Sequence, residues 1–172
     1  MLLKLFSSRK RRAERQSLFR NFLFGVEDSL VSTVGLLSGV AAAGTQKSVI
    51  VTTGIVLIFV EAFSMGIGSF LSEETSREII KTRFSRVLVI KSALVMFVSY
   101  FVAGFIPLFP HILFSGDQAW LYSIASTLFA LTVLGGVMAK LFQGKIVWKA
   151  VEMLLLGGLA TGIGIAIGRL LG

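Results

Sequence analysis

Three acidic residues lie inside long apolar stretches of this chain, where a carboxylate is costly to place. They are Glu27 and Asp28 in the run 21–44 and Glu61 in the run 48–72. A charged carboxylate near the centre of a bilayer costs on the order of 3 kcal/mol on insertion scales. No Lys or Arg lies at the same depth in any apolar run to neutralise these acids. The pattern therefore favours a cation or proton site.

Helical spacing predicts which of these residues share a depth. At about 1.5 Å per residue, Asp28 lies roughly 10 Å into a helix that begins at 21, and Met65 roughly 10 Å from the end of one that ends at 72. Successive spans run antiparallel, so we expect Asp28 and Met65 in one layer. Glu61 is one turn deeper than Met65 on the same face. Glu27 points about 100° away from Asp28, so we do not expect both to face one ion.

Carboxylate oxygen suits hard cations and thioether sulfur suits softer ones. A layer of Asp28 and Met65 therefore favours borderline first-row ions such as Fe²⁺ or Mn²⁺. Small and polar residues recur along the first run and support a cavity there: Asn21, Asp28, Ser32, Gly35 and Gly39. Two alternatives stay open: the acids could be protonated and hydrogen-bonded to Ser32, Thr33 or Ser64, and Met65 could serve packing alone.

Other acidic residues flank the apolar runs. Glu73, Glu74 and Glu78 follow the second run and are candidates for gathering metal on the cytoplasmic side. Their alternative is a solvated helix surface, because Arg77 and Lys81 are interleaved with them. Glu152 begins the fifth run, where its side chain can reach the membrane interface.

Enzyme chemistry finds little support in the residues present. The chain has no Cys and one His, His111, and it contains neither HExxH nor GxSxG. We therefore expect no enzyme, no thiolate or histidine metal centre and no permanently bound cofactor.

The composition indicates an all-α integral membrane protein. Hydrophobic residues make up 55% and the mean hydropathy is +0.86. Five apolar runs, each long enough to cross a bilayer, lie at 21–44, 48–72, 87–108, 118–142 and 148–171. Pro107 and Pro110 are expected to end the third helix. Residues 1–20 form a basic cytoplasmic or interfacial segment, and 21–172 form the five-helix transmembrane domain.

The basic residues predict the orientation. With the N-terminus inside, the outer segments hold only Lys47 and Arg169 of the 17 Lys and Arg residues. The positive-inside rule then places the N-terminus in the cytoplasm and the C-terminus outside. The net charge of +8 follows from these flanking residues, so nucleic acid is not the expected partner; the bilayer is.

Glycine pairs spaced by four residues predict close helix packing. The pairs are Gly35 with Gly39, Gly158 with Gly162, and Gly164 with Gly168.

Several motifs resemble the vacuolar iron transporter family. FRNFLFGVEDSLVSTVGLLSGVAAAG is similar to the family's G-x-x-D-G-L-x-x-x-x-x-x-x-x-G helix. EAFSMGIGSFLSEETSREI resembles A-x-S-M-x-x-G-E-Y-x-S-x-x-S-x-x-E, and GFIPLFP resembles I-P-L-x-P. KAVEMLLLGGLATGIGIAIGRLLG is similar to the glycine-rich last helix. The resemblance covers about 20–172.

The resemblance implies a five-helix protomer that acts as a homodimer and moves Fe²⁺ or Mn²⁺ out of the cytosol in exchange for protons. It also implies that Asp28 and Met65 line the path. Ser29 and Ser69 stand where the family has Gly and Glu, and only 73–86 separate the second and third spans, where many members carry a long metal-gathering insert.

The leading hypothesis is therefore a divalent metal exporter with proton antiport. The alternatives are a transporter of another ion on the same scaffold, and a non-transporting membrane scaffold or partner protein. The expected location is a prokaryotic plasma membrane, or alternatively an organelle membrane.

Overall fold

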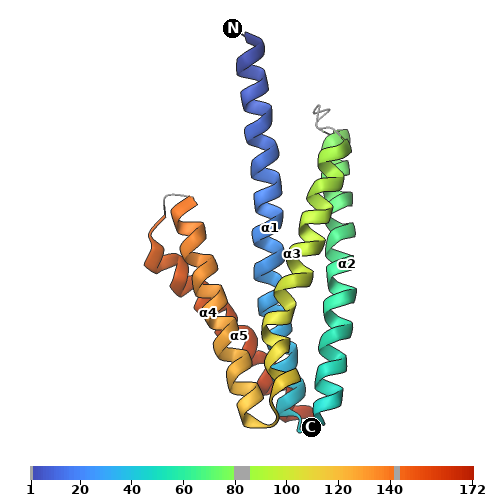
Figure 1. Cartoon of the computed structure of the whole chain (residues 1–172), viewed down its shortest axis with the longest axis vertical. Coiled ribbons are helices and arrows are strands. Elements are labelled where there is room, and N and C mark those ends of the chain that lie inside the picture. Colours follow the sequence, from blue (N-terminus) through green and yellow to red (C-terminus); the bar gives the residue numbers. More distant parts are fainter. Residues whose placement is uncertain (1, 80–85, 142–143) are drawn as a thin grey trace.

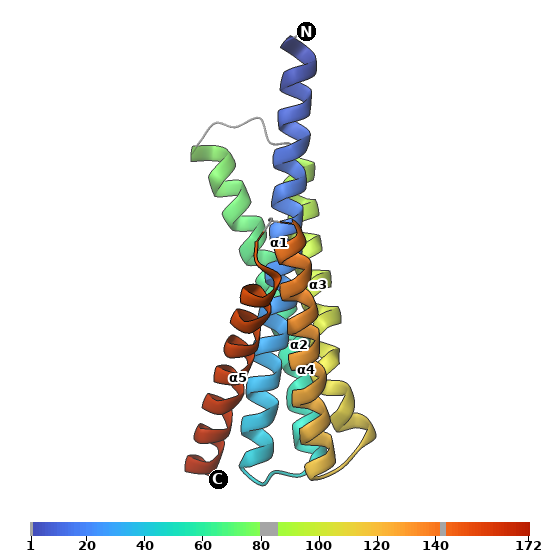
Figure 2. The same cartoon turned by 90° about the vertical axis from the view of Figure 1, so that its left-hand side faces the viewer.

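The described part of the chain forms five long helices, arranged as Figures 1 and 2 show. The computed structural model describes residues 2–79, 86–141 and 144–172, with side chains from residue 14 onward. The helices are α1 (Leu2–Ala42), α2 (Lys47–Ile79), α3 (Arg86–Leu113), α4 (Asp117–Leu141) and α5 (Ile146–Leu171). All five are long and apolar enough to cross a membrane. The prediction of an all-α protein with five spans is confirmed.

Helix α1 is the central element and contacts each of the other four helices. Figure 1 shows α4 and α5 on one side of it and α2 and α3 on the other. In the view of Figure 1 the helices lie closer together at the end that carries the C-terminus, here called the convergent end, than at the opposite, divergent end. Among the described residues, α2 contacts neither α4 nor α5. The two sides of the molecule are therefore joined mainly through α1 and α3.

The interior is small for a chain of this hydropathy. Leu30, Leu37 and Ile58 are fully buried, whereas Phe63 of α2 and Leu159 of α5 are more than half exposed. In water such side chains would favour aggregation, but in a bilayer they face lipid tails at no cost. Their exposure agrees with membrane insertion.

Helix α3 continues past both of its prolines, so the prediction that they end it at 108 is wrong. A proline removes one backbone donor and frees the carbonyl four residues earlier. Pro110 frees the carbonyl of Ile106, and the Ser126 hydroxyl of α4 lies at the limit of hydrogen bonding to it, 3.5 Å away. Ser123 donates to the carbonyl of Pro107 at 2.7 Å. Hydroxyl groups from a neighbouring helix stabilise such a segment inside a membrane.

The basic N-terminal segment continues α1 as one helix from Leu2, with no break before 21. In both views this part of α1 projects beyond the other helices along the same axis. A segment lying flat in the membrane interface would require a bend that the helix does not have.

Glycines bring α1 and α5 into backbone contact. A Cβ on Gly164 would overlap the carbonyl oxygen of Gly35, and one on Gly168 would overlap that of Gly39. Only glycine permits this approach. Gly158 and Gly162 differ from the expectation: a Cβ on either would have no described atom within 4 Å. These two residues therefore do not pack against another helix of this chain.

Candidate functional site

A cavity of about 350 Å³ opens between α1, α2 and α3, away from the end where the helices converge. It contains two thioethers, one carboxylate and several small polar groups. Its lining consists of Arg20, Asn21, Phe24, Met65, Gly68, Ser69, Ser72, Glu73 and Met96. The α2 members recur every three or four residues, so they share one face of that helix.

Two polar groups of this cavity have no partner among the described residues. Asn21 and Ser69 are both buried, and Asn21 Nδ2 and Ser69 Oγ form no hydrogen bond. A buried polar group without a partner costs about 1–3 kcal/mol. Water or a hydrated ion inside the cavity would supply the missing partners.

Glu73 is held at the mouth of the cavity. Its Oε1 accepts a hydrogen bond from Ser17 Oγ at 2.5 Å and pairs with Arg20 Nη2 at 3.0 Å. Ser17 also lies 3.1 Å from Ser92 Oγ, which joins α1 to α3. Both contacts to Glu73 use the same oxygen, so Oε2 remains available to a cation.

Asp28 and Glu61 lie close enough for their charges to interact. Within the described part of the chain, neither acid has a hydrogen-bond or ion-pair partner. The Ser32 hydroxyl bonds the Tyr100 hydroxyl at 2.7 Å instead, and Thr33 Oγ1 has no partner. The alternative of carboxyls satisfied by neighbouring hydroxyls is therefore not seen for Ser32 or Thr33. Two carboxylates within electrostatic range of each other, and without another partner among the described residues, favour a shared cation or proton.

The structure corrects the predicted layers by about one helical turn. Met65 shares its cavity with Asn21 and Phe24, one to two turns before Asp28. Glu61, predicted to lie deeper, is the electrostatic neighbour of Asp28. The cause is the assumed helix ends: α1 begins before 21 and α2 continues beyond 72. An error of four residues displaces a side chain by about 6 Å.

Asp28 also lines a groove of about 640 Å³ between α1 and α5. Ser32, Gly35 and Gly39 continue the same wall of this groove. The polar stripe proposed for the first helix therefore divides between two spaces: Asn21 faces the cavity with Met65, and the remainder faces this groove.

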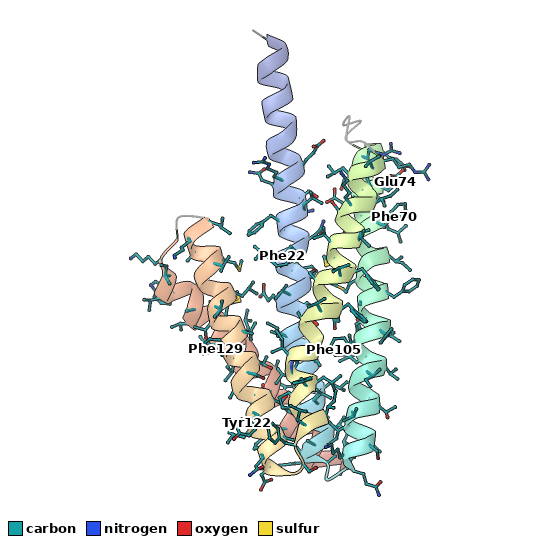
Figure 3. All side chains as sticks on the ribbon, viewed as in Figure 1. Phe22, Phe70, Glu74, Phe105, Tyr122 and Phe129 are labelled. Atoms are coloured by element: carbon teal, nitrogen blue, oxygen red, sulfur yellow. The ribbon has the colours of Figure 1, made fainter. Side chains whose placement is uncertain are left out.

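The other candidate acids do not join these groups. Glu74 pairs with Arg77 at 2.5 Å and lies near the end of α2, beyond Phe70 (Figure 3). Glu78 is exposed and does not line the described cavity. Of the three acids after the second span, the structure brings only Glu73 to Met65.

Glu27 and Asp28 have different neighbours. Asp28 lies near Glu61 of α2, whereas Glu27 lies near the start of α5. It lies within electrostatic range of Glu152 and Lys149 at the start of α5. Lys149 pairs with Glu152 at 2.6 Å. Glu27 is therefore separated from the cavity containing Met65.

Reasoning from sequence missed Met96 and Tyr100 of α3. Met96 contributes the second sulfur of the cavity, and Tyr100 orders the Ser32 side chain. A signal was present in the third apolar run, where Ser92, Met96 and Tyr100 recur every four residues on one helical face.

Ser29 has a structural explanation. Its hydroxyl is buried and donates to the carbonyl of Tyr100 at 2.6 Å. Gly104 makes room for it, because a Cβ there would lie 2.9 Å from Ser29 Oγ. The serine thus joins α1 to α3.

No group of three or more His, Cys, Asp or Glu residues that could hold a metal exists among the described residues.

Comparison with known proteins gives the family. The VIT family model matches residues 19–89 and 83–169, nearly all of the spanning region. The chain belongs to the VIT family. Its VIT relatives include proteins named vacuolar iron transporter: one from Centaurea cyanus is 23% identical over 83% of this chain and 83% of its own length. One from Tulipa gesneriana is 22% identical over 87% of this chain and 85% of its own length. One from Arthroderma benhamiae is 37% identical over 45% of this chain and 31% of its own length.

This VIT protein is a short member. Its match to the Centaurea relative extends over 203 aligned positions, but 83% of this chain is about 143 residues (0.83 × 172). About 60 positions therefore have no counterpart here. The two segments matched by the family model overlap at 83–89, where α3 begins. The expected absence of a long segment at this place agrees with both observations.

The family and the relatives' names indicate a multi-pass membrane transporter and not an enzyme. These VIT relatives are plant and fungal proteins named vacuolar. The expectation of a prokaryotic plasma membrane has no support from them.

Proposed function

We propose that this protein exports a divalent metal ion, Fe²⁺ or Mn²⁺, from the cytosol in exchange for protons. The observation that carries the proposal is the succession of donors along α1–α3: two sulfurs and Glu73 in one cavity, then the unpartnered pair Asp28 and Glu61. The relatives named vacuolar iron transporter favour iron as the substrate. An organelle membrane agrees with those names.

The ion would enter at Glu73, where Oε2 is available, and shed part of its hydration shell against Met65 and Met96. Carboxylate and thioether together favour borderline ions over Ca²⁺ or Mg²⁺. The ion would then reach Asp28 and Glu61. Because metal ligands must be deprotonated, protons arriving from the far side would release it there.

A homodimer would complete the path. Asp28 lies on the wall of an open groove between α1 and α5, so one copy encloses the ion on one side only. We place a second copy over this groove, with both first helices facing the path. The orientation in this proposal has the N-terminus in the cytosol, as the basic residues predict.

Uptake by proteoliposomes tests the path. We expect Asp28→Asn and Glu61→Gln each to lower the initial rate of Fe²⁺ or Mn²⁺ uptake at least ten-fold, because each removes a charge that attracts the ion without changing side-chain size. Glu152→Gln is the matched control, since that acid is half exposed and paired with Lys149, and should keep normal uptake. An acidic lumen should accelerate uptake in the unmodified protein.

The outcomes separate the alternatives. Undiminished uptake in Asp28→Asn would remove that residue from the path. Strong competition by a different ion would indicate another substrate on the same scaffold. A protein without uptake or metal binding, and indifferent to both substitutions, would be a scaffold.

A further inference from the structure

A second cavity, of about 270 Å³, lies at the opposite end of the molecule, where the helices converge. It collects the ends of all five helices, from Ala42 of α1 to Arg169 of α5. It shares no lining residue with the cavity that contains Met65.

This cavity brings together the two basic residues of the outer segments. Lys47 begins α2 and Arg169 ends α5, 122 positions apart in the sequence, and both line it. Neither forms a salt bridge with a described residue, although Asp117 lines the same cavity. Two unpaired cations at one small site lower the cost of binding an anion.

Two polar rings of the cavity also lack partners. His111 is 3% exposed and Trp120 is half-buried, and within the described residues His111 Nε2 and Trp120 Nε1 form no hydrogen bond. The indole nitrogen can only donate, and a neutral imidazole can donate from one nitrogen. Lys47 lies within electrostatic range of His111. Ammonium, guanidinium and ring N–H groups are the donors that bind an oxyanion.

A metal ion fits this site less well. His111 and Asp117 would be its only strong ligands, and two are too few for a divalent ion. Lys47 and Arg169 would also repel it. With His111 neutral, the side chains of the cavity sum to a charge of +1.

We propose that this cavity is a binding site for a phosphate-type oxyanion, held by Lys47 and Arg169 with the ring N–H groups of His111 and Trp120 as further donors. The phosphate can be a free ion or a lipid headgroup at the membrane surface. The site is independent of the metal path, since no residue named for that path contributes to it.

Tryptophan fluorescence provides a direct readout. The chain has two tryptophans, and Trp148 is 70% exposed and outside the cavity. In the full-length Trp148→Phe protein, Trp120 is the remaining indole. In maltoside detergent, which carries no phosphate, titration with inorganic phosphate should change Trp120 emission saturably. Chloride at equal ionic strength should not.

Substitution then tests the donors. Lys47→Gln with Arg169→Gln should weaken phosphate binding at least ten-fold, and both residues are exposed, so folding should persist. Lys140→Gln with Lys145→Gln removes the same charge from exposed positions outside the cavity and should leave binding unchanged. Phospholipid and galactolipid nanodiscs distinguish the two sources of phosphate. If the site binds a lipid headgroup, phospholipid nanodiscs should abolish the response to added phosphate and galactolipid nanodiscs should keep it. If the site binds the free ion, both kinds of nanodisc should show the response.

Three results would overturn the proposal. They are no saturable response in detergent or in either nanodisc, an equal response in the Lys47 and Arg169 double variant, or a response to Mn²⁺ instead of phosphate that His111→Gln abolishes.

Discussion

Methionine side chains from two helices line the cavity at the divergent end of the molecule. Met65 of α2 and Met96 of α3 both line it, together with Asn21 of α1. Thioethers are polarisable and discriminate against hard cations such as Ca²⁺, which prefer oxygen. The selectivity of the proposed path is therefore assigned to these two side chains, and its affinity to the carboxylates.

Replacing Met96 by leucine tests this role. Leucine has a similar volume, so the change should remove a ligand while keeping the packing. We expect KM for Fe²⁺ to rise about ten-fold, which corresponds to about 1.4 kcal/mol, with little change in Tm. The Met65→Leu and Met96→Leu double variant should also be inhibited by Ca²⁺.

Met153→Leu is the control for that substitution. Met153 is buried in the core cluster with Leu30 and Leu131 and does not line the cavity. Concentration-dependent uptake and thermal unfolding should be measured on all variants. A rise in KM as large in Met153→Leu as in Met96→Leu would show a packing effect and contradict the ligand role.

At the scale of elements, the contact of α1 with α5 depends on the absence of side chains. Gly35 and Gly39 face Gly164 and Gly168 so closely that backbone meets backbone. In lipid, where no hydrophobic effect drives helices together, such close packing is a principal source of association. The same four glycines line the groove beside Asp28, so packing and the proposed path share one surface.

Gly164→Ala should therefore be destabilising. Its methyl group would overlap the Gly35 carbonyl, and relieving the overlap must separate α1 from α5. We expect a loss of about 1–3 kcal/mol, typical of overpacking, measured as a lower Tm in detergent. Gly162→Ala, which adds the same methyl group two residues away in open space, should keep the normal Tm. Equal Tm values for the two variants would contradict the contact.

The whole molecule is polarised along its long axis. The cavity with Met65 lies toward the divergent end, near the basic N-terminal part of α1, and the cavity with Lys47 and Arg169 lies at the convergent end. Positive charge on the cytoplasmic side fixes orientation during insertion. The proposed direction of transport therefore depends on which end faces the cytosol.

Labelling of single cysteines measures that orientation. The chain has no native Cys, so Ser76→Cys on α2 and Gln118→Cys on α4 each introduce the only thiol, at exposed positions near opposite ends. In intact cells with the protein in the plasma membrane, an impermeant maleimide should label Gln118→Cys. Ser76→Cys should react only after permeabilisation. The reverse pattern would invert the topology and the direction of export.

The number of spans follows from the amino-acid sequence alone, because crossing a bilayer requires about 20 apolar residues in a helix and the chain has five such runs. The sequence also carried the family motifs around Asp28 and Met65 and the glycine spacing of α1 and α5. These features are local: they depend on residue type and on a fixed helical period.

Which residues from different helices lie together depends on how the helices pack in three dimensions. Asp28 lies near Glu61, while Met65 shares a cavity with Asn21 and Met96, because helical period gives the face of a residue but not the translation of one helix along another. Hydroxyls of α4 lie against backbone carbonyls of the proline-containing end of α3, a contact that no local pattern contains. The acids first singled out thus lie at depths set by how α1, α2 and α3 pack together.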